Sequence, residues 1–276
     1  MAVLSVDLAY RRWSDLGIVV LDRTRSEPAH ADQSAGAPTI RCEILPSVAA
    51  GQNEGPIDAE ILAGRLNHLC AVRGIRVMML DGPQAWKSKT NGFAHARVSE
   101  RELNTAAKTG LPGMVKPATY RLFAEFCLDV YDALCRRGWR RLDASAHNAA
   151  RQERVPPERI QERIQDRILV ESYPYAAWKS LGLAPLPSKR RARVSDLAQA
   201  YGALRTVVPF TTDRPPNHDQ LQAIVGGLPG LDIEERNTLA VRIVGNPPRR
   251  EDGHWREGFI VLPLPPRRPF GLRWLN

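Results

Sequence analysis

The sequence predicts an α/β fold in which a mixed sheet has three antiparallel strands first and parallel strands later. Three short apolar segments lie within residues 2–45, and their connections allow antiparallel neighbours. An amphipathic segment at 57–73 then leads into an apolar segment at 75–81, and a strand–helix–strand unit of this length joins parallel strands. A fifth apolar segment at 167–174 follows a further helical stretch.

The first elements follow from local composition. Three segments are apolar, β-branched or alternating in polarity, as strands are: residues 2–9, 16–21 and 39–45. In the next segment, Ile61, Leu62 and Leu66 recur at helical spacing, and Gly74 is a suitable end for that helix. The strand at 75–81 then ends abruptly at Gly82-Pro83.

The remaining segments predict helices and insertions around the same sheet. Helical periodicity is expected at 117–138, 175–181, 194–207 and 217–228. We expect one domain over residues 1–276, with an irregular lid insertion at about 84–116, a charged insertion at about 140–166 and a Pro/Arg-rich tail at about 247–276.

Composition excludes several classes of protein. Of the 276 residues, 43% are hydrophobic, which is ordinary for a folded protein, yet no apolar run approaches the ~18 residues of a membrane span. Asp7 and two following arginines interrupt the N-terminal apolar stretch that a signal peptide would need. The four cysteines form no zinc-binding pattern. Membrane, secreted and disordered classes are therefore excluded, and a cytoplasmic protein is expected.

The net charge of +9 is unevenly distributed. Residues 1–135 carry 15 basic and 15 acidic side chains, whereas residues 136–276 carry 24 basic and 15 acidic ones. Because arginine pairs bidentately with phosphate, an arginine-rich half is typical of a protein that binds an anionic polymer. A genome that uses arginine at every solvated positive position explains the same excess, so both interpretations stay open.

Three carboxylates stand at strand positions where a fold rarely needs them. Asp7 interrupts the first strand, Asp81 ends the fourth and Glu171 ends the fifth. Ligands bind at the carboxyl ends of strands in α/β sheets, so these groups converge there if the three strands are neighbours. Clustered carboxylates repel one another unless a cation neutralises them, and oxygen ligands of this kind select Mg²⁺ or Mn²⁺.

Each carboxylate also has an ordinary structural interpretation. Asp81 precedes Gly-Pro and could close a turn. Glu171 could pair with Arg167 or with another of the many arginines. Asp7 has no such explanation, because no turn obviously begins for several residues after it.

Several short motifs follow one another in a characteristic order: VLSVDLA, MMLDGPQAW, RELNTAAKTGLPG, VESYPYAAWKSLG, PSKRRARVSDLAQAY, NHDQLQAIVGGL and EGFIVLP. This order, from residue 3 to about residue 263, resembles a family of uncharacterised proteins that are predicted to be RNase H-like nucleases. The resemblance implies a mixed five-stranded sheet with helices on both faces, together with divalent metal ions.

The resemblance also implies the acidic site of that family. Its first-strand Asp, its strand-end Asp before a Gly/Pro turn, the Glu of its Glu-x-(Tyr/His)-Pro motif and its helical Asp fall on Asp7, Asp81, Glu171 and Asp219. They would act as catalytic residues and as ligands of two Mg²⁺ or Mn²⁺ ions. Relatives carry a second Asp where Gln222 stands here.

Candidate nucleic-acid-binding residues are basic and lie beside these motifs. Family-like basic elements fall on Arg101-Glu102 and Lys189-Arg190. In the lid insertion, Lys87 follows Trp86, so this segment could stack a base and hold a strand, or could be a disordered connection. The run 189–193 could bind phosphates or be ordinary solvated surface. His218 could shuttle a proton or be a helix-cap histidine.

The sequence therefore favours a metal-dependent nuclease of RNase H-like fold that hydrolyses phosphodiester bonds of DNA or RNA. Gln222 supports an alternative, a nucleic-acid-binding or regulatory module that keeps the fold without cleaving. A phosphotransferase of the related actin-like fold ranks last, because that fold needs glycine-rich phosphate turns and no glycine stands at residues 8–10.

Overall fold

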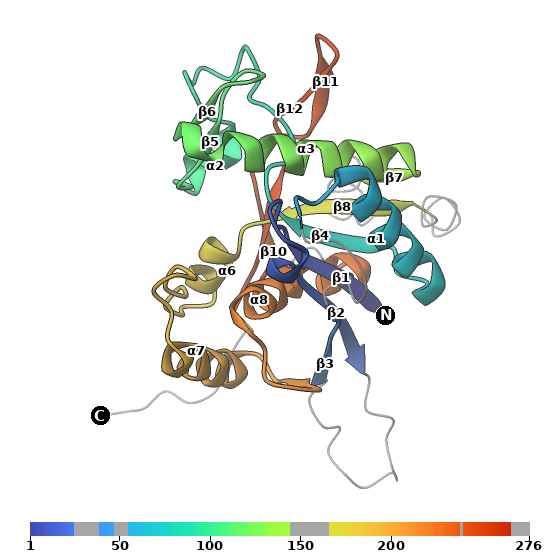
Figure 1. Cartoon of the computed structure of the whole chain (residues 1–276), viewed down its shortest axis with the longest axis vertical. Coiled ribbons are helices and arrows are strands. Elements are labelled where there is room, and N and C mark those ends of the chain that lie inside the picture. The colour runs from blue at the N-terminus through green and yellow to red at the C-terminus, as the bar shows by residue number, and fades with distance from the viewer. Residues whose placement is uncertain (25–38, 47–54, 144–165, 238–239, 266–276) are drawn as a thin grey trace, which may run out of the picture.

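The structure is a computed structural model of the chain, and it describes residues 1–24, 39–46, 55–143, 166–237 and 240–265 (Figure 1). The predicted loop at 26–37, most of the charged insertion at 140–166 and the end of the Pro/Arg-rich tail lie outside the described residues. None of the helices in the described ranges has the length and apolar character needed to cross a membrane.

The five predicted strands form the centre of the sheet, in the order β3-β2-β1-β4-β8. They are β1 (Ala2–Asp7), β2 (Gly17–Thr24), β3 (Thr39–Ile44), β4 (Val77–Asp81) and β8 (Arg167–Ser172). The first three are antiparallel to one another, β4 is parallel to β1, and β8 is parallel to β4. The predicted α/β fold, in which three antiparallel strands are followed by parallel ones, is confirmed.

The sheet is larger than predicted, because short strands extend it to nine strands at both edges. One edge carries β9, and the other carries β7, β13 and β10: β7 (Trp139–Arg141), β9 (Phe210–Thr212), β10 (Val241–Val244) and β13 (Ile260–Pro263). Strand β13 lies within the segment expected to be a tail, and all four of its residues are buried. Such short segments have too few residues to show a strand period, so only their pairing partners identify them.

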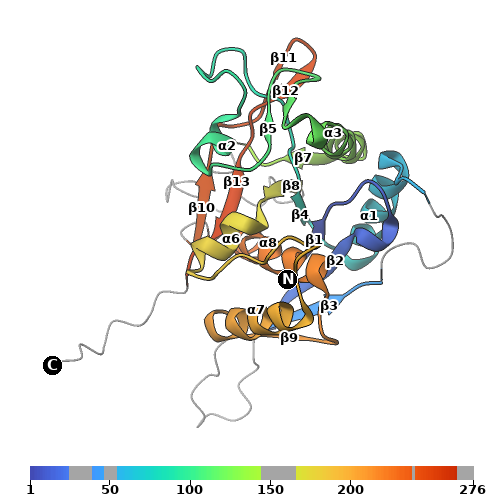
Figure 2. The ribbon, with the colours of Figure 1, turned by 60° about the vertical axis from the view of Figure 1, so that its left-hand side comes forward.

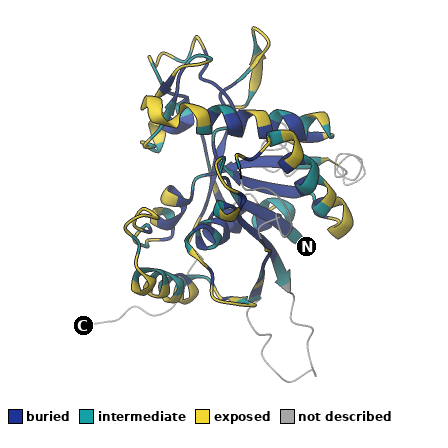
Figure 3. Cartoon of the chain, viewed as in Figure 1, coloured by how far each residue is buried: buried dark blue, intermediate teal, exposed yellow. Residues whose placement is uncertain are grey.

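Helices cover both faces of the sheet, as the resemblance implied. On one face, α1 (Ala59–Arg73) packs against α3 (Arg121–Arg136). On the other, α8 (His218–Glu234) crosses β1, β2 and β4, with α6 (Pro174–Ser180) beside it and α7 (Val194–Val207) farther out (Figures 1 and 2). Burial is concentrated in the strands and the inner faces of these helices (Figure 3).

Glycines allow α8 to lie unusually close to the sheet. A Cβ atom at Gly227 would lie 2.6 Å from Ser5 Cβ, and one at Gly230 would lie 2.7 Å from Val3 Cγ1. Real Cβ atoms essentially never approach other atoms so closely, so a larger residue would displace the helix. The Ser5 hydroxyl donates to the carbonyl of Ala223 at 2.6 Å and fixes the helix further.

The lid insertion is ordered and joins a C-terminal hairpin. It contains α2 (Val98–Glu102) and the two-stranded sheet of β5 (Lys108–Thr109) and β6 (Val115–Lys116). The hairpin of β11 (Arg249–Glu251) and β12 (His254–Arg256) lies at the same end of the molecule (Figures 1 and 2). Backbone hydrogen bonds join them, since Trp86 N–H donates to Trp255 O at 3.0 Å.

Candidate functional site

Asp7 and Asp81 end two neighbouring parallel strands, β1 and β4. They lie directly opposite each other in the register of this strand pair, so both side chains project from the same face of the sheet. Their carboxyl groups are hydrogen-bonded to each other.

Helix α8 brings Asp219 to the same place. Asp219 lies in the first turn of the helix, and the Asn217 side chain caps that turn by accepting from Gln220 N–H at 2.9 Å. Gly17, which pairs with Asp7 across β1 and β2, makes room for this turn: a Cβ atom there would lie 2.2 Å from the Asp219 carbonyl oxygen. The absent side chain of Gly17 thus allows the third carboxylate to lie beside the first.

The three carboxylates share an unfavourable electrostatic environment. Burial raises the pKa of Asp7 well above its usual range, the charges of Asp81 and Asp219 raise it further, and Lys189 lowers it. Burial also raises the pKa of Asp81 to about 7, against the opposing effect of the hydrogen bond with Asp7. Strongly perturbed carboxyls at the carboxyl ends of strands are typical of ligand-binding or catalytic sites.

The raised pKa values predict that the metal-free protein loses stability as the pH rises. A carboxyl whose pKa is higher in the folded chain contributes stability that is complete below its unfolded pKa of about 4. This stability is lost as the pH rises through the folded value, which is about 7 for Asp81. In EDTA, the melting temperature should fall from about pH 5 to about pH 8. Asp81→Asn should flatten that fall, and equal slopes for the two proteins would contradict the assignment.

Lys189 supplies the positive charge nearest to Asp219. Its ammonium forms ion pairs with Asp219 and, at 2.8 Å, with Asp15. On the other side of Asp219, the carboxylate lies 3.2 Å from His218 Nδ1, and His218 Nε2 lies 3.0 Å from the carbonyl oxygen of Pro187. The cation and the histidine together orient the Asp219 carboxylate. The expected basic residue Lys189 therefore lies within the acidic site.

Glu171 belongs to the opposite face of the sheet. In the register of β4 and β8, Glu171 pairs with Leu80, whereas Asp81 pairs with Ser172. Because alternate residues point to opposite faces, Glu171 shares the face of Leu80, whose side chain packs in the core with α1 and α3. The structure thus brings Asp7, Asp81 and Asp219 together, and it places Glu171 on the other face, where its charge still raises the pKa of Asp81.

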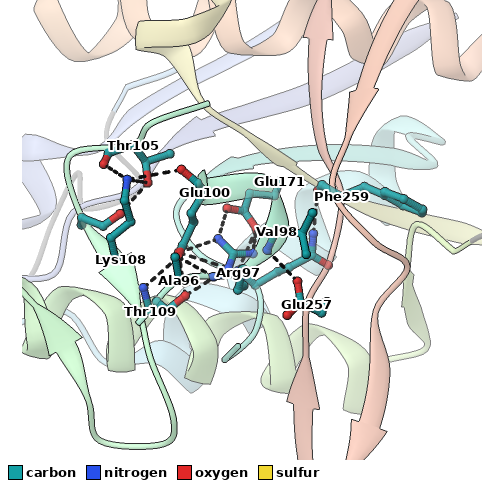
Figure 4. Close-up of polar contacts among 12 residues, drawn as sticks. Ala96, Arg97, Val98, Glu100, Thr105, Lys108, Thr109, Glu171, Glu257 and Phe259 are labelled. Atoms are coloured by element: carbon teal, nitrogen blue, oxygen red, sulfur yellow. Dashed lines mark hydrogen bonds and ion pairs between the residues drawn. The ribbon is translucent and has the colours of Figure 1, made fainter. Parts of the chain in front are cut away.

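Arg97 is the partner of Glu171 (Figure 4). Its guanidinium donates to the two Glu171 oxygens at 2.7 and 2.6 Å, and the Gln84 N–H donates to Glu171 at 3.1 Å. Arg97 also contacts Glu100 at 3.1 Å and the Thr109 hydroxyl at 3.0 Å. Arg97 is only 1% exposed, so one buried cation lies between two buried carboxylates and ties the lid to β8.

Sequence reasoning did not single out Arg97 with Glu100, nor Asp15. The spacing Arg97-x-x-Glu100 was a usable signal, because residues three apart face each other at the start of a helix. The pairing of Asp15 with Lys189 joins residues far apart in the chain and has no local signal.

Gln222 stands where the resemblance implies a second Asp, and its side chain makes a contact between two helices. The Gln222 side-chain oxygen accepts a hydrogen bond from the Trp178 indole N–H at 2.9 Å. Gln222 thus fixes α8 to α6 instead of extending the carboxylate cluster.

The other candidate nucleic-acid-binding residues differ in accessibility. Arg101 on α2 and Arg190, next to Lys189, are exposed. Lys87 is only 5% exposed, and its ammonium donates to the Ser88 carbonyl at 2.7 Å, so it does not lie on an accessible surface. Trp86 beside it is also buried, so this part of the lid packs inward.

Asp7, Asp81 and Asp219 fit a divalent cation by their chemistry. Among the residues that the structure describes, no three His, Cys, Asp or Glu side chains are already arranged to hold a metal ion. The three carboxylates nevertheless offer only oxygen atoms, as hard cations require. The Asp7–Asp81 pair is half-buried, and the charges that raise its pKa values are ones that a bound cation would neutralise.

Comparisons with known proteins add a distant structural likeness. No protein-family model matches the chain, and no curated protein matches it. The solved structure of Thermus thermophilus RuvC is similar at a TM-score of 0.36 and 13% identity, over 90% of this chain and 99% of that one. T. thermophilus RuvC in complex with a Holliday junction substrate is similar at a TM-score of 0.33 and 12% identity, over 83% and 91% of the two chains.

Proposed function

We propose that this protein is a metal-dependent nuclease that hydrolyses phosphodiester bonds of nucleic acid. The observation that carries the proposal is the half-buried pair of Asp7 and Asp81, which lie opposite each other at the ends of neighbouring strands, with Asp219 beside it. A fold gains nothing from placing three carboxyl groups together at this point, since their mutual repulsion destabilises the folded chain once they ionise. A bound substrate or cation would explain why the groups are kept there.

Asp7, Asp81 and Asp219 are the proposed ligands of Mg²⁺ or Mn²⁺. A divalent ion held by such carboxylates activates water and stabilises the leaving oxygen in phosphodiester hydrolysis. Glu171 is proposed as a positioning residue, because both of its oxygens accept hydrogen bonds from Arg97. The backbone N–H of Gln84 also donates to the Glu171 carboxylate, and this hydrogen bond fixes the turn that follows Asp81.

Arg190 and Arg191 are the proposed phosphate contacts. Both are exposed, and no acidic partner lies beside either of them in the described part of the chain. They directly follow Lys189, which contacts Asp219, and we propose that their guanidinium groups form a rim of the carboxylate site. Arginine at such a rim binds phosphate bidentately and lowers the repulsion between nucleic acid and the carboxylates.

The direct test of the proposal is cleavage of labelled single-stranded, duplex and branched oligonucleotides with Mn²⁺, Mg²⁺ or EDTA. We expect products with either metal and none in EDTA. Calorimetry in the absence of nucleic acid should show Mn²⁺ binding that is lost in Asp7→Asn. Absence of both cleavage and Mn²⁺ binding would overturn the proposal.

A second candidate function is nucleic-acid binding without cleavage. It is favoured by two contacts: Gln222 bonds to Trp178 where an acid could have joined the cluster, and Lys189 neutralises Asp219. Salt-dependent binding of nucleic acid with no metal-dependent turnover would establish this function in place of the first.

Replacing Lys189 by methionine is expected to tighten Mn²⁺ binding by roughly 10-fold, because an ammonium no longer competes for the Asp219 carboxylate. Calorimetry at neutral pH without nucleic acid measures the change. The matched control is Arg190→Met in the same segment. It should leave Mn²⁺ affinity unchanged. It should also reduce the slope of log K against log salt concentration for nucleic-acid binding by the amount expected for about one phosphate contact. Unchanged or weaker Mn²⁺ binding in Lys189→Met would contradict the competition.

A further inference from the structure

A pocket lies where the lid meets the carboxyl ends of β4 and β8. We call it the lid pocket. Asp81, Ser172 and Tyr173 line it from the strand ends, and Thr105, Tyr120 and Phe123 line it from the lid and the start of α3. The buried network of Arg97, Glu100 and Glu171 forms another part of its wall (Figure 4). The lid pocket therefore opens directly beside one of the proposed metal ligands.

The size of the lid pocket restricts its occupant. Its volume is about 190 Å³. Pockets for drug-sized ligands run from roughly 300 to 1,000 Å³. A space of this size holds a single planar ring system and excludes a base pair. An occupant that is part of a nucleic acid would therefore enter as one unpaired base.

The charges around the lid pocket exclude an anion as its occupant. Asp81, Glu100 and Glu171 line it, and Arg97 is the one basic residue in its lining. The guanidinium of Arg97 is already held by Glu100 and Glu171. A phosphate would face a wall of net negative charge, because three carboxylates outnumber one guanidinium, whereas a neutral base meets no such repulsion.

Aromatic side chains supply the surface that a base requires. Tyr120 is 42% exposed, and Phe123 and Tyr173 are partly buried. The Tyr173 hydroxyl accepts a hydrogen bond from the backbone N–H of Ala106, which holds the lid to the strand end. Stacking on such side chains is worth about 1–3 kcal/mol per base and tolerates any base.

We propose that the lid pocket binds one unpaired nucleobase, next to the phosphodiester group on which Asp7 and Asp81 would act. This inference rests on the proposed function, and it specifies the substrate as a nucleic acid with an unpaired nucleotide at the cleavage site. A continuous duplex would have to extrude a base, at a cost of a few kcal/mol, and should bind less tightly.

The test measures binding of a short single-stranded DNA oligonucleotide that contains fluorescent 2-aminopurine, in EDTA so that no cleavage is needed. We expect the wild-type protein to quench the fluorescence by stacking and to bind the single strand more tightly than the matched duplex. Tyr120→Ala should weaken single-strand binding roughly 5- to 100-fold, as loss of a stacked base does. An abasic nucleotide at the pocket position should produce the same loss in the wild-type protein.

The matched control is Phe93→Ala. Phe93 is 37% exposed and also belongs to the lid insertion, yet it does not line the pocket. Its replacement should change single-strand affinity less than twofold, and far-UV circular dichroism should show both variants folded. Equal affinities of Tyr120→Ala and wild type, or equal affinities for single strand and duplex, would overturn the pocket assignment.

The two proposals fail in different ways. If the protein binds an unpaired base in EDTA but never cleaves with Mn²⁺, the lid pocket stands and the nuclease proposal fails. If Mn²⁺-dependent cleavage is found but Tyr120→Ala and the abasic nucleotide have no effect on binding, the nuclease proposal stands and the pocket assignment fails.

Discussion

Replacing Asp7 by asparagine is expected to reduce Mn²⁺-dependent cleavage by roughly 10²- to 10⁴-fold, because metal-assisted stabilisation of the transition state is worth several kcal/mol. The substitution removes one ionisable group from the Asp7–Asp81 pair and keeps the shape of the side chain. Folding should therefore persist, and the metal-free protein at pH 8 should be at least as stable as the wild type, since the pKa of Asp7 is raised mainly by burial. Single-turnover cleavage and thermal melting measure the two effects.

Asp22→Asn is the matched control for Asp7→Asn. Asp22 lies on the adjacent strand β2, is 45% exposed at its side chain and pairs with the N-terminal ammonium at 3.1 Å. Surface pairs of this kind contribute little to stability, so cleavage should stay within about twofold of the wild type. Cleavage by Asp7→Asn at the level of this control would remove Asp7 from the catalytic site.

Replacing Arg97 by methionine is expected to lower the free energy of unfolding by about 3–5 kcal/mol, because two buried carboxylates lose their shared cation. The side-chain exposures of Arg97, Glu100 and Glu171 are 1%, 4% and 5%, so water cannot replace the guanidinium. Urea denaturation followed by circular dichroism measures the change.

Arg121→Met is the control for Arg97→Met. Arg121 pairs with Glu125 at 2.8 Å, but its side chain is 58% exposed, so its loss should cost less than about 1 kcal/mol. Adding Glu171→Met to Arg97→Met should recover part of the loss, because a buried charge is then removed with its partner. Similar stabilities for Arg97→Met and Arg121→Met would show that the buried network does not hold the lid.

The helix ends and strand-end residues that were predicted from sequence are each marked by a pattern within a few neighbouring residues. Helix α7 has the predicted bounds, and α1 ends at Gly74, whose φ of +66° is the left-handed conformation that glycine adopts without strain. The positions of Asp7 and Asp81 at strand ends also follow from composition, because each interrupts or closes an apolar run. Local propensity and periodicity act within a few residues, so they are visible in the chain.

The partners of charged residues depended on contacts between distant segments. Glu171 was expected either in the acidic site or in an ion pair with an arginine, and the structure pairs it with Arg97. Arg167 instead donates to the Asn67 side chain at 2.7 Å. Both pairings depend on the register of the sheet. A shift of β8 by one residue would turn Glu171 to the other face of the sheet.

The basic excess of the second half is used in more than one way. Arg141 and Arg256 are buried, and Arg141 pairs with Asp132 at 2.7 Å. Lys189 contacts Asp219, and the exposed Arg190 and Arg191 follow it directly in the chain. Composition therefore indicated a charge excess, whereas burial and pairing determine which arginines remain available for phosphate.

The sequence by itself determined the central strands, most of the helices and the two aspartates that end strands, Asp7 and Asp81, because each follows from composition over a few neighbouring residues. Asp219 was identified only through the resemblance to the nuclease family. The tertiary structure alone decided that Asp7, Asp81 and Asp219 share one face and that Glu171 lies on the other. It also decided the close approach of α8 at Gly17 and the lid pocket. These features depend on strand register and helix packing, which join residues far apart in the chain and are fixed only when the whole core is assembled.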